Sequence, residues 1–201
     1  MEALRVLGRQ AASNPSVVLP PMRLVFVRLI AEIKNSCDNR LKEEATLMLC
    51  TFLRAGPLQT VVRPFMSATV RALPLKGDVR LTTAGLEAAG ELCVVLRQDM
   101  LQYSDQLLPV IVHHMQDPTS RRKQEMAVRT LGQLVCATGQ VVKPYLQYPQ
   151  LLPRALDTLC KRDSTLPWSL RREVLRTLGL LGALEPHKYS LITLHLQVRT
   201  L

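Results

Sequence analysis

Apolar residues recur every three or four positions along most of the chain, with short polar breaks between the apolar runs. In the segment 22–33 the apolar set is Met22, Val25, Phe26, Leu29, Ile30 and Ile33. This spacing places side chains on one face of an α-helix, which has about 3.6 residues per turn. A polar turn at 35–39 follows, and a second amphipathic segment covers 40–54. The pattern predicts helices that are arranged in pairs.

A short sequence motif occurs twice in nearly the same form. Residues 129–134 read Arg-Thr-Leu-Gly-Gln-Leu, and residues 176–181, which begin 47 positions later, read Arg-Thr-Leu-Gly-Leu-Leu. Weaker copies lie near positions 8, 50 and 90. Repetition at about 40–47 residues is typical of stacked helical hairpins. The predicted fold class is therefore all-α: a HEAT/armadillo-like α-solenoid of about four helical hairpins plus a partial fifth.

We expect the solenoid segment to cover residues 1–189 and residues 190–201 to form a divergent C-terminal tail. The predicted repeats are approximately 14–54, 61–97, 101–138 and 144–184. Their first helices are expected at 22–33, 65–75, 103–116 and 148–161. Pro20, Pro64 and Pro144 keep a similar spacing, and proline is tolerated in the first turn of a helix. Each of these prolines is therefore expected to open a first helix.

The repeated motif has a glycine at its centre in most copies. These glycines are Gly8, Gly90, Gly132 and Gly179. A glycine inside a helix costs about 1 kcal/mol relative to alanine, so a gain in packing should offset it. We expect the glycines to have a structural role, because they allow the second helices of neighbouring repeats to approach closely.

Aspartates in the predicted turns and arginines near the starts of the second helices follow the same repeat. These candidate site residues are Asp38, Arg40, Asp78, Arg80, Asp117, Arg121, Arg122, Asp163, Arg171 and Arg172. A turn aspartate can accept hydrogen bonds from the free N–H groups of a helix start, whereas an arginine there opposes the helix dipole and needs an anionic partner. Two interpretations stay open: an ion-pair ladder between repeats, or a basic strip for an acidic partner. The cluster Arg121-Arg122-Lys123 is otherwise expected to be solvated.

The cysteines and histidines indicate no metal or redox chemistry. Cys50, Cys93 and Cys136 recur every 43 residues, which favours one small packing thiol per repeat over disulfides or zinc. Free thiols suit a reducing compartment. His113 and His114 are neighbours on a helix and point about 100° apart, so they cannot hold a metal together. We expect no cofactor, no metal and no catalytic residue, since nucleophile-elbow and kinase-loop motifs are lacking.

The chain carries 26 basic and 16 acidic residues, a formal net charge of +10, which favours acidic partners. Nucleic acid is nevertheless disfavoured as a partner, because only 4% of the residues are aromatic and single strands bind by stacking on aromatic rings. The most apolar segment, 17–33, contains Arg23, Arg28 and Glu32, so membrane insertion is not expected.

Part of the chain resembles the target-of-rapamycin kinase family. The resemblance rests on Leu-Gly-Gln-Leu-Val at 131–135, Thr-Gly at 138–139, Val-Val-Lys-Pro-Tyr at 141–145, Tyr-Pro at 148–149, Arg-Arg-Glu at 171–173 and Leu-Gly-Leu-Leu-Gly-Ala-Leu-Glu-Pro-His-Lys at 178–188. The last of these is the most specific. Weaker similarity upstream extends the resemblance over most of residues 4–189.

This resemblance implies that the chain is a fragment of the long HEAT solenoid of such a kinase, away from its catalytic domain. It implies a parent Ser/Thr kinase in nutrient and growth signalling, whose solenoid binds raptor-type or rictor-type subunits or a second kinase protomer. No catalytic, ATP-binding or rapamycin-binding residue maps onto this chain. We therefore expect a non-catalytic protein–protein interaction scaffold in the cytoplasm, and through the parent complex at endomembranes, the lysosome surface or the nucleus. The alternative is a stand-alone basic HEAT-type adaptor that binds nucleic acid or an acidic protein.

Overall fold

The computed structural model describes residue 6 and residues 15–54, 59–160 and 166–181, and all regular structure in these ranges is helical. The elements are α2 (Pro15–Asn35), α3 (Asn39–Arg54), α4 (Gln59–Val62), η1 (Arg63–Phe65), α5 (Met66–Ala72), α6 (Val79–Leu96), η2 (Arg97–Tyr103), α7 (Ser104–Gln116), α8 (Arg121–Thr138), α9 (Lys143–Gln147), α10 (Leu151–Cys160) and α11 (Trp168–Leu181). The prediction of an all-α solenoid is confirmed.

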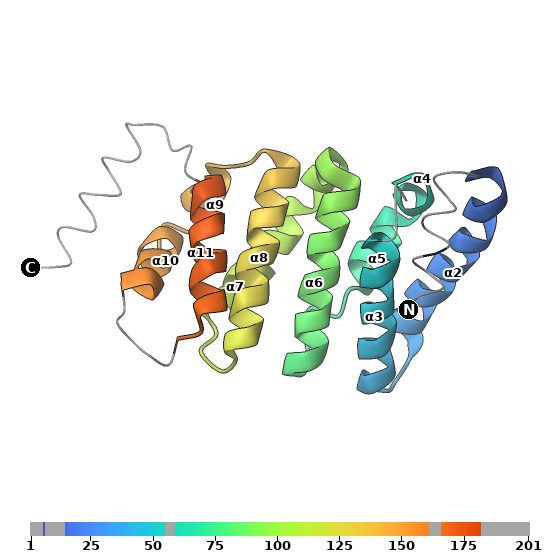
Figure 1. The fold of residues 1–201 in the computed structure, drawn as a ribbon, viewed down its shortest axis with the longest axis horizontal. Helices are drawn as coiled ribbons and strands as arrows, with labels where there is room; N and C mark the ends of the chain where they lie inside the picture. Colours follow the sequence, from blue (N-terminus) through green and yellow to red (C-terminus); the bar gives the residue numbers. More distant parts are fainter. Residues whose placement is uncertain (1–5, 7–14, 55–58, 161–165, 182–201) are drawn as a thin grey trace, which may run out of the picture.

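The helices form two layers. The long helices α3, α6, α8 and α11, which we call the second helices, lie side by side, and each contacts the next (Figure 1). The other layer consists of α2 and of the shorter elements that precede each later second helix. The helical pairs thus occupy 15–54, 59–96, 97–138 and 143–181, beside the repeats expected at 14–54, 61–97, 101–138 and 144–184. The partial fifth hairpin and the tail fall outside the described residues.

The first helices of the later repeats are broken, where the sequence pattern predicted single helices. Pro64 stands at the start of the 3₁₀ turn η1, between α4 and α5, and Pro144 stands in the first turn of the short α9. Proline lacks an N–H group and clashes with the preceding turn, so the helical path breaks near it. The first-helix layer therefore begins earlier than expected in each of these repeats and consists of short pieces.

Pro20 does not open a first helix. It lies with Pro21 inside α2, which begins at Pro15, so the prediction for this proline was wrong. Both prolines are exposed, and each leaves one carbonyl group of the preceding turn without a backbone donor.

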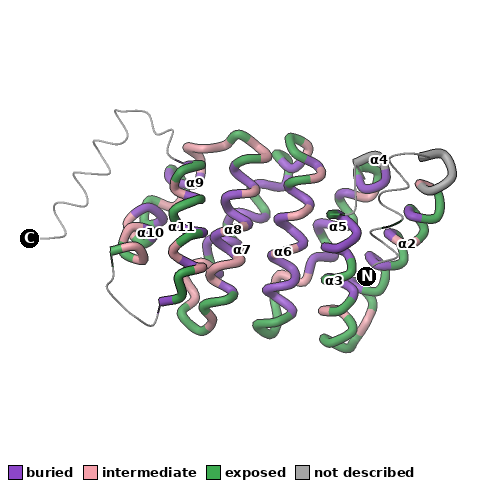
Figure 2. Tube along the Cα trace, viewed as in Figure 1, coloured by how far each residue is buried: buried purple, intermediate pink, exposed green. Residues whose placement is uncertain are grey.

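A large apolar core runs between the two layers, where the inward faces of the helices are buried (Figure 2). A smaller second cluster, at the C-terminal end, consists of Val128, Ala155, Leu166, Leu170 and Val174. At the N-terminal end the rings of Phe26 and Phe52 lie 5.5 Å apart, and Phe65 lies 6.2 Å from Phe26. Farther along, the fully buried side chains come from both layers and include Leu86, Leu92, Leu96, Met100, Leu107, Ile111 and Leu131. Stacking of repeats therefore buries the apolar faces that single hairpins leave open.

His114 joins the first-helix layer of one repeat to the loop of the preceding repeat. Its Nε2 lies 2.9 Å from the backbone oxygen of Leu75. A carbonyl only accepts, so Nε2 donates and Nδ1 is unprotonated. Nδ1 is buried without a hydrogen-bond partner among the described residues, so a second proton there would be unsatisfied. Burial accordingly lowers the pKa of His114, with Lys123 and His113 contributing in the same direction.

We expect His114 to make the fold acid-sensitive. Because its pKa is lower in the folded state, the unfolded chain binds more protons as the pH falls below about 6.5, and the free energy of unfolding falls with it. His114→Gln keeps a donor for Leu75 but does not titrate, so urea unfolding followed by circular dichroism should depend less on pH between about 6.5 and 5. The exposed neighbour provides a comparison: His113→Gln removes only a minor cause of the lowered pKa of His114, so it should flatten the slope far less than His114→Gln does. Equal slopes in wild type and His114→Gln would contradict this assignment.

Candidate interaction surface on the second helices

The second helices contact one another through two of the predicted glycines. A Cβ atom on Gly90 would lie 2.0 Å from Oε1 of Gln133 on α8. One on Gly132 would lie 3.0 Å from Oγ1 of Thr177 on α11. These glycines therefore face the next second helix at short range, as their spacing suggested. Around Gly179 nothing lies within 4 Å, and Gly8 falls outside the described residues.

Gly85 is a close-packing residue that the sequence analysis missed. A Cβ atom there would lie only 2.4 Å from the backbone oxygen of Pro74, in the loop that leads to α6. The signal was present, because Ala45 and Ala127 stand 40 residues before and 42 residues after it, and both are buried. A small residue thus recurs on the inner face of the second helices, in addition to the motif glycines.

The threonines of the repeated motif join neighbouring second helices by hydrogen bonds. Oγ1 of Thr130 donates to the backbone oxygen of Leu86 on α6 at 2.8 Å, and Oγ1 of Thr177 donates to that of Val128 on α8 at 3.0 Å. Both threonines are buried. The threonine at the same position in both copies of the motif indicated this role in the sequence, since a buried hydroxyl requires a hydrogen-bond partner.

The turn aspartates bond within their own turns. Asp38 accepts from the N–H of Arg40 at 2.8 Å, and Asp78 caps α6 by accepting from the N–H of Leu81 at 2.7 Å. Asp117 accepts from the N–H of Thr119 and pairs with the buried ammonium of Lys123, which holds the pKa of Asp117 below its usual range. Lys123 is therefore not solvated as expected.

In the structure, Asp38, Asp78 and Asp117 do not form the expected ladder between repeats. Their carboxylates instead bond to backbone N–H groups of their own turns, and that of Asp117 also pairs with Lys123. Arg40 pairs with Glu44 on its own helix, and Arg121 donates to Gln124. Asp163 lies outside the described residues. Arg80, Arg122 and Arg172 are exposed, and Arg171 is half-buried, so a basic strip stays a prediction.

Other ion pairs join the repeats. Arg54 of α3 lies 2.5 Å from Glu87 and 2.7 Å from Glu91 of α6, and the hydrogen bond with Glu91 raises the pKa of Arg54. Arg129 of α8 lies 3.2 Å from Glu173 of α11. Arg54 ends α3 and Arg129 lies in the middle of α8, whereas the predicted ladder lay at the helix starts.

The cysteines share a spacing but not an environment. Cys50 and Cys93 are buried, and burial raises the pKa of both thiols to about 12, so they are unreactive packing groups. Cys136 is exposed, and its predicted packing role was wrong. Cys93 follows its motif glycine by three residues and Cys136 follows Gly132 by four, so they are rotated by about 100° relative to each other.

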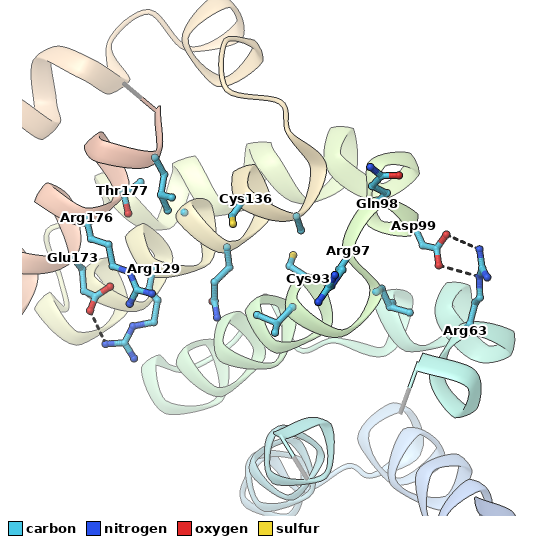
Figure 3. A pocket seen from close by; sticks show the side chains of 16 residues that line it. Arg63, Cys93, Arg97, Gln98, Asp99, Arg129, Cys136, Glu173, Arg176 and Thr177 are labelled. Carbon is cyan, nitrogen blue, oxygen red and sulfur yellow. Dashed lines mark hydrogen bonds and ion pairs between the residues drawn. The ribbon is translucent and has the colours of Figure 1, made fainter. Parts of the chain in front are cut away.

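A groove of about 900 Å³ crosses α6, α8 and α11, which we call the arginine groove (Figure 3). Its charged lining residues are Arg63, Arg97, Asp99, Arg129, Glu173 and Arg176. Arg63 pairs with Asp99 at 2.9 Å, so this pair closes one end. Arg97 has φ 51° and ψ −122°, and it is the one non-glycine residue with positive φ in the described ranges. Such a conformation costs about 1–3 kcal/mol and often marks a functional position.

Within the described ranges, no three His, Cys, Asp or Glu side chains gather as a metal site would require. None of the described helices combines the length and apolar character needed to span a membrane.

Gly85 and Gly179 should respond oppositely to the same substitution. Gly85→Ala should lower the free energy of unfolding, because its Cβ meets fixed backbone at Pro74. Gly179→Ala has open space and should raise it by up to about 1 kcal/mol through helix propensity. Urea unfolding of the chain measures both. A stabilising Gly85→Ala would show that the approach to Pro74 is loose.

Arg129 and Glu173 should be energetically coupled. Arg129→Met leaves a carboxylate that is 4% exposed, and Arg172 at 3.8 Å is the one other cation that pairs with it among the described residues. We expect a loss of about 2 kcal/mol, below the usual 3–5 kcal/mol because Arg129 itself is partly exposed. Adding Glu173→Gln should recover part of this loss. A double variant that loses the sum of both single effects would show that the pair is not coupled.

Sequence comparisons identify relatives of this chain. A family model described as the serine/threonine-protein kinase mTOR domain matches residues 141–200. The serine/threonine-protein kinase TOR of Arabidopsis thaliana is 37% identical over 196 residues, and TOR2 of Saccharomyces cerevisiae is 33% identical over 192 residues. The mTor of Drosophila melanogaster is 33% identical over 196 residues.

These matches cover 94% of this chain but only 8% of each relative. The family match runs to residue 200, so it includes most of the tail that we expected to diverge. The chain is therefore related to the target-of-rapamycin kinases along most of its length, and the resemblance noted in its sequence is confirmed.

Proposed function

We propose that this chain is a non-catalytic protein-interaction segment of a target-of-rapamycin-type kinase. The observation that carries the proposal is that the chain forms a regular helical stack and is similar to a segment of those kinases. That segment is about 8% of their length. Such stacks present extended surfaces for other proteins. No motif of a phosphate-binding or kinase loop stands in the sequence, so the kinase activity of the relatives is proposed for a parent protein and not for this chain.

The partners that we propose are raptor-type or rictor-type subunits, or a second kinase protomer, in the cytoplasm or on endomembranes. The exposed basic residues at the starts of the second helices support an acidic partner. Arg80 and Arg122 are exposed, and neither has an ion pair among the described residues. The net charge of +10 has the same sign.

The net charge also favours a second candidate function, that of a basic adaptor that binds nucleic acid. The ion pairs argue against this candidate, because several cations already pair with carboxylates of the chain: Arg54, Arg63, Arg129 and Lys123. Nucleic-acid binding needs cations that are free to contact phosphates, and it weakens steeply with salt.

The proposal is tested with the purified 201-residue chain immobilised on a biosensor. Purified raptor-type and rictor-type subunits of Saccharomyces cerevisiae are passed over it at physiological salt. We expect saturable binding of at least one subunit, weakened about tenfold by the double change Arg80→Glu and Arg122→Glu, which reverses two contacts of the proposed strip.

A matched control places the same charge change on the other layer. Arg28 of α2 and Arg71 of α5 are exposed, so Arg28→Glu with Arg71→Glu should bind like wild type. Absence of binding by both subunits would reject the proposed partners. Binding of a 20-nucleotide RNA that falls steeply between 50 and 200 mM salt would instead support the nucleic-acid adaptor.

A further inference from the structure

The arginine groove contains cations that no carboxylate in the described part of the chain neutralises. Arg63 and Arg129 have carboxylate partners in the groove, Asp99 and Glu173. Arg97 and Arg176 line the same groove, and neither has an ion pair among the described residues. Two free guanidinium groups in a concave surface attract anionic groups, because each offers several N–H donors in a planar array.

One oxygen of a buried carboxylate in the groove has no hydrogen-bond donor within the described ranges. Glu173 is 3% exposed, and its Oε1 faces Arg129. Its Oε2 is buried without a hydrogen-bond partner in the described part of the chain. Buried oxygens of this kind are rare, and each loses the bonds that water would give. Figure 3 shows Glu173 on the wall of the groove beside Arg129 and Arg176. A ligand that carries a hydrogen-bond donor would satisfy this oxygen.

The strained backbone of Arg97 points to the same site. Arg97 ends α6 with the positive φ described above, although glycine would adopt that conformation more easily. Figure 3 shows its side chain in the groove, on the opposite side of Cys136 from Arg176. The residue with the unfavourable backbone conformation is therefore one of the two arginines without an ion pair that line the groove.

The spacing of the two free arginines favours an extended ligand. Arg97 follows α6 and Arg176 lies on α11, so α8 stands between them. Packed helices lie about 8–10 Å apart, so the helix segments that carry the two arginines stand roughly 16–20 Å apart. An extended peptide of about six residues spans this distance at about 3.3 Å per residue, whereas a single phosphate would leave most of it uncovered. Val94 and Leu180, 54% and 37% exposed, offer apolar contacts along the path.

We propose that the arginine groove binds an extended acidic segment of a partner protein, with carboxylates at Arg97 and Arg176 and a hydrogen-bond donor at Glu173. This inference deepens the proposed function and rests on it. The site differs from the strip at the helix starts, because it lies on the C-terminal halves of α6 and α8.

The test uses a phage-displayed library of random twelve-residue peptides, selected on the wild-type chain. Arg97→Gly with Arg176→Gln serves for counter-selection. Peptides that survive should carry two acidic clusters about six residues apart. Synthetic copies, measured by fluorescence anisotropy, should bind the double variant at least tenfold more weakly. Arg28→Gln with Arg71→Gln, which removes two exposed arginines from the other layer, should leave their affinity unchanged.

Arg97→Gly alone separates binding from folding. Glycine relieves the positive φ, so the midpoint of thermal unfolding should rise while peptide affinity falls about tenfold. A merely structural arginine would not give that combination.

Other outcomes overturn the proposal. Selected peptides without acidic bias, or with equal affinity for the double variant, would exclude this groove as the site. Displacement of the peptides by inorganic phosphate at low millimolar concentration would assign a small-anion site instead. If a raptor-type or rictor-type subunit binds the chain but no groove-dependent peptide emerges, only the groove proposal fails. Peptide binding without binding of either subunit would reject only the proposed partners.

Discussion

The close approach of the second helices is the constraint on which the rest of this structure depends. Gly90 and Gly132 bring α6, α8 and α11 together, and Thr130 and Thr177 hydrogen-bond across the same contacts. The core between the layers can close only when these helices stand at this distance. A larger side chain at Gly132 would press on Thr177, whose hydroxyl bonds to Val128, and so would strain the contact between α8 and α11, whereas one at Gly90 would first displace the flexible end of Gln133. Ion pairs such as Arg129 with Glu173 then fix which parts of the helices lie opposite each other.

The partner of each carboxylate depends on whether it lies near the contacts between second helices or in the turns. Carboxylates near the helix contacts pair with arginines of the neighbouring repeat, and carboxylates in the turns bond to backbone N–H groups. Since the chain has fewer acids than bases, some arginines are left over. Within the described ranges, Arg97 and Arg176 are unpaired arginines in a concave groove, whereas Arg80 and Arg122 are unpaired arginines on an open edge. One surplus of charge therefore produces two surfaces of different shape.

The sequence predicted the features that follow from periodicity, and missed those that depend on contacts between helices. Apolar spacing and the motif glycines gave the all-α stack and the close approach at Gly90 and Gly132. The ion pairs were not predictable, because an arginine such as Arg54 or Arg129 has several carboxylates within reach and only the packing of the helices decides among them. The prediction that Cys136 is buried was wrong, because its position relative to the motif glycine differs by one residue from that of Cys93, and one residue turns a side chain by about 100°. The arginine groove draws residues from three repeats, so no local pattern reveals it.

The two layers differ in continuity, and this difference has a mechanical consequence. Each second helix is an unbroken rod, whereas the opposite layer is interrupted at Pro64 and Pro144. Force along the stack runs across the helix axes, so it acts on the contacts between neighbouring helices and not on the helices themselves (Figure 1). The second helices α6, α8 and α11 are joined across those contacts by Thr130, Thr177 and the pair of Arg129 with Glu173. The opposite layer of short pieces would therefore separate first, and the surface on α6, α8 and α11 would keep its internal spacing while the array bent.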